Sequence, residues 1–456
     1  MPTDTLTILE YTRQPDALFA LSDEQLLLLI RDDFEDELRR LKHAYSVGGR
    51  SDIKPSTRSP SKILYSDEED HDEVNRTLVG LLTLKWIYNK QYDILVGNQP
   101  EILRLSRKSF EWIHTFYKDY VRSPDELYAL ITSIVVNDIG KDEGLAREYQ
   151  DAEGEDISTA NHDLVLLKAV QSGFVKCLDR LSPEDKADIM RGMELGAEFN
   201  FGQLAQAENA PACLASLAKM RGHARSFRLR FMEQLLDIAG AAGHLDWTCA
   251  KKLTQSNFDA YRTVYDAGIG IIEGGLSLRE GYDLVLQRRL DLLRKKGFRT
   301  VNLKEKDDRA LARILCMSSV ADLDTAELYE RAWTSLEDDV RQSLRTSLNI
   351  DGTIAEPAVQ VTYIPALITQ AVDVNGPWST EEKERSLRSA LRFLCRVMTA
   401  PGKPDGPVSV IERNVLSVLK DVVQTEQFRE DPTILEKVPI PDSLAAMTEP
   451  NEQQPG

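Results

Sequence analysis

The fold class is clearest in the stretch SPDELYALITSIVVND, residues 123–138. Ser123 can cap the start of a helix, Pro124 suits the first helical position, and the two acidic residues that follow face the positive end of the helix dipole. Apolar side chains then dominate up to the polar pair at the end of the stretch. This pattern predicts a helix that runs to about Asp138.

The same helix-start signals recur on both sides of that stretch, whereas strand signals are scarce. A second proline-containing start lies at 182–185, and capping boxes occur at Ser22-x-x-Gln25, Ser277-x-x-Glu280 and Ser379-x-x-Glu382. After the first of these boxes, apolar residues recur at helical spacing up to Leu41. The two Asp-Gly pairs, at 351–352 and 405–406, fall in loops rather than between alternating strands. The sequence therefore predicts an all-α, multi-helical globular protein.

Composition suggests how these helices are divided along the chain. Residues 1–45 are predicted to form an N-terminal helical segment, and residues 46–73, rich in glycine, serine, proline and acidic residues, a flexible loop. A main all-helical domain is expected over 74–430, with Gly196 ending one of its helices. Residues 431–456 are expected to form a frayed tail.

Charge and cysteine content limit the classes of partner and compartment. Among the 456 residues, Lys and Arg total 56 against 74 Asp and Glu, which gives a net charge of −18. Such a field repels nucleic acid and anionic membrane surfaces, so we expect a small-molecule substrate or ligand instead. The five cysteines are widely spaced and no signal peptide is evident, which favours buried free thiols in a cytoplasmic protein. The sequence does not indicate an oligomeric state.

The residues that could carry chemistry gather where two helices are expected to meet. Asn137-Asp138-Ile139-Gly140-Lys141 ends the first helix, and Asn161-His162-Asp163 begins a later one. Carboxylates and neutral imidazoles are ligands for Mn, Fe, Mg or Zn ions, and a bound ion acidifies water for attack on phosphorus. Only six histidines occur in the chain, and four of them lie between residues 114 and 244.

Over residues 112–247, this order resembles the HD superfamily of metal-dependent phosphohydrolases, an all-helical family in which a histidine, a His-Asp pair and a later aspartate bind metal. The resemblance implies an HD-like central helical core and a divalent metal as cofactor. It also implies a phosphohydrolase acting on a small phosphorylated or nucleotide-like substrate, with Asp138 and Lys141 as catalytic residues. The metal ligands that it implies are His114, Asp138, His162 and Asp246.

The motif departs from that family at Asn137, which stands where the family has its histidine. An amide offers only a weak carbonyl oxygen where an imidazole nitrogen would bind a transition metal firmly. We therefore expect weak metal binding or lost catalysis.

An alternative interpretation explains the same residues as helix caps. Gly140 would take the left-handed position at a helix end, Lys141 would lie beside the last carbonyls, and Asn161 would cap the next helix. The protein would then be a non-catalytic helical ligand-binding or scaffold protein.

A second group of polar residues interrupts an otherwise apolar segment between Glu194 and Asn209. If that segment is buried, its polar groups must pair or line a wet pocket. The candidate substrate-binding residues are Glu208, Asn209, His223 and His244, and either histidine could instead serve as the general base of an unrelated enzyme. Further on, Glu233 and Asp237 stand four residues apart, and an arginine such as Arg228 or Arg230 is expected between them.

Several other segments resemble a family of uncharacterised fungal proteins, and this resemblance covers most of the chain. They are FGQLAQAEN at 201–209, MEQLLD at 232–237, the small residues of 239–244, SLREGY at 277–282 and RALAR at 309–313. That family implies one shared architecture and no particular activity.

Overall fold

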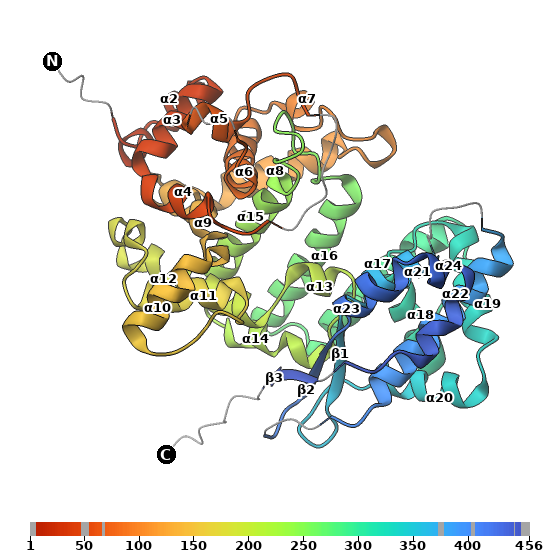
Figure 1. Ribbon diagram of the computed structural model, residues 1–456. Coiled ribbons are helices and arrows are strands. Elements are labelled where there is room, and N and C mark those ends of the chain that lie inside the picture. Colours follow the sequence, from red (N-terminus) through yellow and green to blue (C-terminus); the bar gives the residue numbers. More distant parts are fainter. Residues whose placement is uncertain are drawn as a thin grey trace. The chain divides into compact units, whose positions relative to one another are not determined.

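The computed structural model describes residues 6–46, 54–65, 69–372, 378–402, 406–441 and 443–447, which are predominantly helical (Figure 1). The predicted all-α class is confirmed, with one small three-stranded sheet as the exception. The chain divides into two compact units, each with its own internal contacts. Unit 1 comprises residues 1–197 and 222–262, and unit 2 comprises residues 198–221 and 263–456.

The regular elements of the described part of unit 1 are helices and short 3-10 turns, apart from one isolated β-bridge between Ala44 and Asp142. Its elements are α1 (Ile8–Tyr11), α2 (Pro15–Ala20), α3 (Asp23–Asp33), α4 (Glu35–Leu41), α5 (Pro60–Tyr65), α6 (Asp72–Tyr88), α7 (Tyr92–Leu95), η1 (Glu101–Leu103), α8 (Arg107–Tyr120), α9 (Pro124–Val136), η2 (Ile139–Lys141), α10 (Glu143–Glu153), α11 (His162–Gln171), η3 (Lys176–Arg180), α12 (Pro183–Glu198) and α15 (Ala224–Gly240). Helix α16 (Gln255–Ile272) begins in unit 1 and continues into unit 2.

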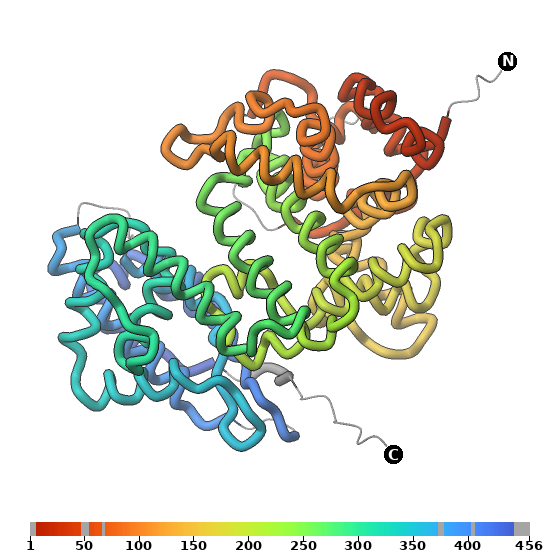
Figure 2. The backbone as a smooth tube through the Cα atoms, turned by 180° about the vertical axis from the view of Figure 1, so that it is seen from behind, coloured from red at the N-terminus to blue at the C-terminus, as the bar shows by residue number. Residues whose placement is uncertain are grey.

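The centre of unit 1 is α6, which is buried along nearly its whole length. Its main partner is α15, and α8 and α9 also pack against it (Figures 1 and 2). Two glycines allow α6 and α15 to approach closely: a Cβ at Gly240 would lie 2.1 Å from the Arg76 carbonyl oxygen, and one at Gly80 would lie 2.9 Å from that of Leu236. The small residues near the end of α15 therefore set the distance between the two helices.

Unit 2 combines a helical core with the sheet. Its elements are α13 (Phe201–Ala205), η4 (Pro211–Leu214), α14 (Ala215–Lys219), α17 (Leu278–Lys295), α18 (Lys306–Met317), α19 (Leu323–Thr334), α20 (Asp338–Ser347), β1 (Ala358–Thr362), α21 (Ile364–Val372), α22 (Thr380–Thr399), β2 (Val410–Asn414), α23 (Leu416–Val418), the π-helical turn η5 (Leu419–Val423), α24 (Glu426–Glu430), η6 (Pro432–Lys437) and β3 (Ser443–Met447). Strand β2 lies between β1, to which it is parallel, and β3, to which it is antiparallel.

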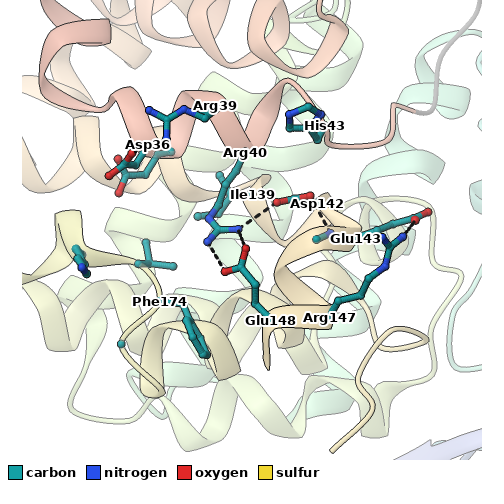
Figure 3. A pocket seen from close by; sticks show the side chains of 15 residues that line it. Asp36, Arg39, Arg40, His43, Ile139, Asp142, Glu143, Arg147, Glu148 and Phe174 are labelled. Atoms are coloured by element: carbon teal, nitrogen blue, oxygen red, sulfur yellow. Dashed lines mark hydrogen bonds and ion pairs between the residues drawn. The ribbon is translucent and has the colours of Figure 1, made fainter. Parts of the chain in front are cut away.

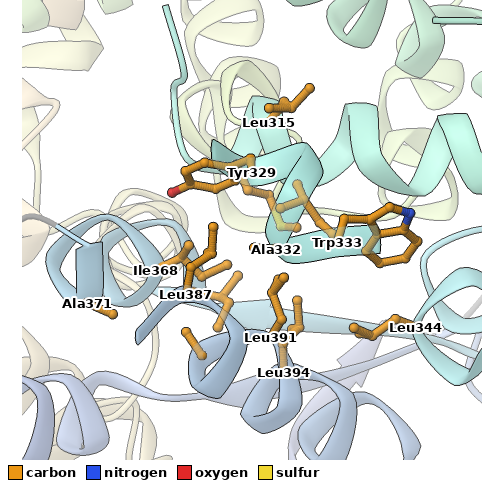
Figure 4. Close-up of a cluster of buried hydrophobic side chains, with 14 of the residues drawn as sticks. Leu315, Tyr329, Ala332, Trp333, Leu344, Ile368, Ala371, Leu387, Leu391 and Leu394 are labelled. Carbon is orange, nitrogen blue, oxygen red and sulfur yellow. The ribbon is translucent and has the colours of Figure 1, made fainter. Parts of the chain in front are cut away.

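The core of unit 2 forms where α18 to α22 converge. Trp333 of α19 is 1% exposed, and it packs with Leu344 of α20 and Leu391 of α22 (Figure 4). Helix α22 presents apolar residues at helical spacing to this cluster and charged residues to the other side. Burying such a face is the main favourable contribution to folding.

Most local predictions agree with the structure. The capping boxes at Ser22, Ser277 and Ser379 form, as does one at Ser123, and all five cysteines are buried and free. The expectation for Gly196 is wrong, because α12 continues through it to Glu198.

The proposed segment boundaries at 45/46, 73/74 and 430/431 stay predictions. The segment 46–73 contains α5 and the start of α6, and residues 47–53 and 66–68 lie outside the described residues. The segment 431–456 contains η6 and β3, and residues 442 and 448–456 lie outside the described residues. Among the helices that the structure describes, none combines the length and the apolar character needed to span a bilayer.

Candidate functional site

The motif of residues 137–141 lies at the C-terminal end of α9, where the backbone passes into η2. Gly140 is not left-handed, contrary to the helix-cap prediction. Its missing side chain has a different use, since a Cβ there would lie 2.0 Å from the His162 carbonyl oxygen. Glycine therefore allows α11 to pack directly on η2. Asn161 caps α11 as predicted, accepting a hydrogen bond from the Leu164 amide at 2.8 Å.

Asp138 is buried next to a cation that comes from its own chain segment. The Nζ of Lys141 lies 2.9 Å from Oδ1 of Asp138 and 3.1 Å from Oε2 of Glu73, at the start of α6. The other carboxylate oxygen of Glu73 accepts from Arg76 at 2.7 Å. The ammonium group of Lys141 thus lies beside the carboxylate that the HD resemblance assigns to a metal ion.

A second cation, Arg230 of α15, binds the opposite side of the same region. Its guanidinium donates to Asp163 at 2.7 Å, to Asn137 at 2.8 Å and to Glu233. Gly196 provides the space for this contact, because a Cβ there would lie 2.6 Å from both Arg230 and Asp163. Arg230 is therefore the predicted arginine partner of Glu233, and it acts on Asp237 through its charge.

Together these side chains form a buried ion-pair network with more acids than bases. Its paired carboxylates are Glu73, Asp138, Asp163 and Glu233, and its cations are Arg76, Lys141 and Arg230. The half-buried Asp237 interacts with these groups through its charge. Because charges are costly to bury, such an excess must be neutralised.

The excess negative charge is reflected in the pKa values of three network acids. Burial, together with the charge of Asp138, raises the pKa of Glu73 and of Asp237, and burial raises the pKa of Glu233 to about 7. Burial also opposes ionisation of Asp138, but Lys141 and a hydrogen bond with Glu73 outweigh it and lower that pKa. Ionisation is therefore disfavoured at Glu73, Asp237 and Glu233 and favoured at Asp138.

The space inside the network is small. A void of about 10 Å³ lies between α6, α9 and α15, bordered by Asn137, Asp138, Glu233 and Asp237. That volume is at the lower limit for a single water molecule, roughly 10–15 Å³. A phosphorylated substrate does not fit there.

The structure brings together only some of the residues that the HD resemblance implies as ligands. The Nε2 atom of His162 lies 3.7 Å from Oδ1 of Asp138, which is too long for a hydrogen bond but is compatible with two ligands of one metal ion. His114 lies on α8, with Nδ1 2.9 Å from the Ile87 carbonyl oxygen. Asp246 accepts from Asn98 at 2.9 Å and from the Thr248 hydroxyl at 2.6 Å.

Among the described residues, no three His, Cys, Asp or Glu side chains are arranged to hold a metal ion. The implied set of four ligands is therefore not assembled.

The predicted substrate-binding residues belong to different units. His223 and His244 lie in unit 1, where His223 is exposed at the start of α15 and His244 is buried. Glu208 and Asn209 lie in unit 2, in a loop whose three carbonyl oxygens at 207–209 accept hydrogen bonds from the buried guanidinium of Arg313.

The buried carboxylate of Glu208 forms no ion pair within the part of the chain that the structure describes. It accepts a hydrogen bond from the Tyr363 amide at 2.6 Å. Burial, and to a smaller extent the charge of Glu412, raises the pKa of Glu208 to about 7 in spite of that hydrogen bond. A shifted buried acid of this kind can exchange a proton near neutral pH.

Unit 1 also contains two pockets large enough for a small molecule. The larger, of about 730 Å³, is formed mainly by α4, α10 and residues 173–176 (Figure 3). Its charged groups largely pair with one another: Arg40 binds Asp142 at 3.2 Å and Glu148 at 2.7 Å, and Arg147 binds Glu143 at 2.8 Å. The other pocket, of about 590 Å³, includes His114.

Sequence reasoning missed Glu73 and Arg76 as members of the network. Glu73 ends the segment predicted as a loop, and its contact with Lys141 across 68 residues brings it into the network together with Arg76, which binds it. No local spacing could have indicated that contact.

No curated protein and no solved structure matches the chain. A family profile, by contrast, matches residues 27–435, which span both units. The chain therefore belongs to DUF6829, a family of unknown function.

Proposed function

We propose that the protein is a non-catalytic, helical ligand-binding protein in which the HD-like motif stabilises unit 1 through ion pairs. The observation that carries this proposal is the position of Lys141, whose ammonium lies 2.9 Å from Asp138 and 3.1 Å from Glu73. An internal cation at that place supplies the positive charge that a metal ion would otherwise supply. The void beside it, of about 10 Å³, leaves no room for a substrate.

Ligand binding is assigned to unit 1 because its two larger pockets, of about 730 and 590 Å³, have the size of small-molecule sites. Such sites usually span roughly 300–1,000 Å³ and combine apolar walls with a few polar groups. Neither pocket includes Asp138, Lys141 or His162 among its lining residues. The motif and the binding surface are thus separate in this proposal.

The test asks whether the stability of the protein depends on a bound metal ion or on the ion pair of Asp138. The melting temperature of the full chain is measured with EDTA and then with Mn²⁺, Mg²⁺ or Zn²⁺, for the parent and for Asp138→Asn. We expect the metals to leave the parent unchanged, and we expect Asp138→Asn to lower the melting temperature equally with and without metal. An Asp246→Asn variant, outside the network, is the control for losing an implied ligand.

The opposite result would support the phosphohydrolase implied by the HD resemblance. A ligand that binds only the folded state raises its stability, by about 2.7 kcal/mol at a concentration one hundred times its Kd. A metal-dependent rise in the parent that disappears in Asp138→Asn would mean that a divalent ion neutralises the excess carboxylates. The non-catalytic proposal would then be abandoned.

A further inference from the structure

The 590 Å³ pocket of unit 1 has an apolar floor and a positively charged rim, and we call it the basic pocket. It lies among the turn between α1 and α2, the C-terminal ends of α6 and α8, and the start of α9. Five buried side chains form its floor: Phe19, Leu84, Ile87, Tyr117 and Leu127. Four exposed cations form its rim: Arg13, Lys90, Lys118 and Arg122.

The rim cations form no close ion pairs in the described part of the chain, although the charge of Arg13 acts on the carboxylate of Glu10. Within the described residues, none of the four forms an ion pair with a carboxylate, although the Nε of Arg122 donates to the Asp119 carbonyl. The pocket has a single carboxylate, Asp16, which accepts the Tyr88 hydroxyl at 2.7 Å. Four cations thus face one acid in a chain whose net charge is −18. The larger pocket, with its internal ion pairs, has no comparable excess of positive charge.

The backbone at Lys90 adds an independent observation. Lys90 follows α6 with a φ of 55°, and the next amide, that of Gln91, donates to the Trp86 carbonyl at 2.8 Å. This is the helix-ending position at which glycine is usual, because other residues are strained there. Lysine at this position costs stability relative to glycine, as do Ala207 and Ser319, which follow other helices with similar φ values. Strain of this kind is typical of functional positions.

We propose that the basic pocket binds an organic anion that has an apolar body. A carboxylate or phosphate head would lie among the rim cations, and the apolar body would cover the floor formed by Phe19, Leu84 and Leu127. This inference rests on the proposed ligand-binding role of unit 1 and adds the site and the chemical class of the ligand. Unpaired cations over a dry floor supply the few polar contacts and the apolar area that such a ligand needs.

Two fluorescent probes that share one body separate the charge from the apolar contact. Anilinonaphthalene sulfonate has a negative charge, and N-phenyl-1-naphthylamine is the same ring system without it. The full chain is titrated with each probe and its fold is checked by circular dichroism. We expect tighter binding of the anionic probe. Lys118→Glu should weaken that binding by about tenfold, equivalent to about 1.4 kcal/mol, and should leave the neutral probe unaffected.

The matched control is Lys108→Glu. Lys108 lies on the same helix, α8, and is exposed like Lys118, but it does not line the basic pocket. Both variants change the net charge of the protein by the same amount. If only Lys118→Glu weakens binding of the anionic probe, the effect comes from the charge at the pocket. An equal loss in both variants would come from the net charge of the protein and would overturn the proposal.

The variant Lys90→Gly distinguishes a ligand-binding role of Lys90 from a purely structural one. Glycine removes the backbone strain, so we expect a higher melting temperature together with weaker binding of the anionic probe. Unchanged probe affinity in this variant and in Lys118→Glu would overturn the proposal.

Dodecanoate and dodecyl phosphate are then used to displace the bound probe. The stronger competitor identifies the preferred head group, and failure of both to displace it would contradict the assigned ligand class. These results do not depend on the metal and Asp138→Asn measurements. The proposal for the basic pocket and the proposal for the motif can therefore be rejected independently of each other.

Discussion

Asp138 in unit 1 and Glu208 in unit 2 are both buried carboxylates, with 4% and 7% of their surface exposed, yet their pKa values shift in opposite directions. Burial opposes ionisation at both sites. At Asp138 the contact with Lys141 outweighs it and the pKa falls. At Glu208 the described part of the chain supplies a backbone amide, that of Tyr363, and no cation to the carboxylate, and the pKa rises to about 7.

This difference shows that a nearby cation can outweigh burial at one acid, as Lys141 does at Asp138. A pairing partner alone does not ensure this, because Glu233 is paired with Arg230 and its pKa still rises to about 7. The basic pocket presents the converse case, in which cations that form no close ion pair in the described residues lie beside an apolar floor. Charges that are already paired stabilise a fold, and unpaired charges are available to a ligand or a proton.

The largest effect is expected when the paired region is broken at Arg230. Arg230→Ala removes the shared partner of Asp163, Glu233 and Asn137 and leaves buried carboxylates uncompensated. We expect a loss of about 3–5 kcal/mol in the free energy of unfolding, measured with urea.

Arg191→Ala is the matched control for Arg230→Ala. Arg191 pairs with Asp188 at 3.3 Å on a side chain that is 34% exposed, so its loss should cost about 1 kcal/mol or less. Similar losses of unfolding free energy in both variants would mean that a buried ion pair of the network stabilises the protein no more than an exposed one.

A pH-dependent effect is expected at Glu208. Its folded pKa of about 7 exceeds the ordinary value of 4.5, so between these pH values the folded state keeps a proton that the unfolded state releases. Stability should therefore fall as pH rises from about 4.5 to about 7 and then level off. Glu208→Gln keeps an acceptor for the Tyr363 amide and should stabilise the protein by about 1–3 kcal/mol at pH 8.

At pH 4 the Glu208→Gln variant and the parent should be equally stable, because Glu208 is then protonated in both states. The measurement is urea unfolding at both pH values. A constant difference between parent and variant would contradict the assigned titration.

A smaller effect is expected from restoring the histidine of the HD motif. Asn137→His removes the acceptor for Arg230 and adds volume at a buried position, so we expect a loss of about 1–3 kcal/mol. Metal should not restore that stability, since Lys141 still lies beside Asp138. A metal-dependent rise in the melting temperature of this variant would show instead that Asn137 alone prevents metal binding.

The smallest effect is expected from a local change that leaves the buried charges intact. Ser123→Ala removes the side-chain cap of α9, whose hydroxyl accepts from the Glu126 amide at 3.1 Å. We expect a loss of about 1 kcal/mol. A loss as large as that of Arg230→Ala would mean that α9 depends on its cap more than on the network.

Much of the helical framework could be predicted from the sequence because its signals are local. The boxes at Ser22, Ser277 and Ser379 and the cap at Asn161 involve atoms only a few residues apart, so sequence spacing is enough to identify them. The sheet was not anticipated, since β1 and β2 pair across a connection that contains two helices. Gly196 and Gly140 were assigned to helix ends, although their role is to admit Arg230 and α11.

The sequence by itself determined the helical class, the start of many helices and the presence of acidic residues and histidines around one motif. Only the tertiary structure decided what those residues meet: Lys141 and Glu73 next to Asp138, Arg230 next to Asp163, and His114 in a pocket away from them. The physical reason is that a cap depends on the nearest turn of the chain. The charge state of a buried acid depends on partners that only folding brings within a few ångströms.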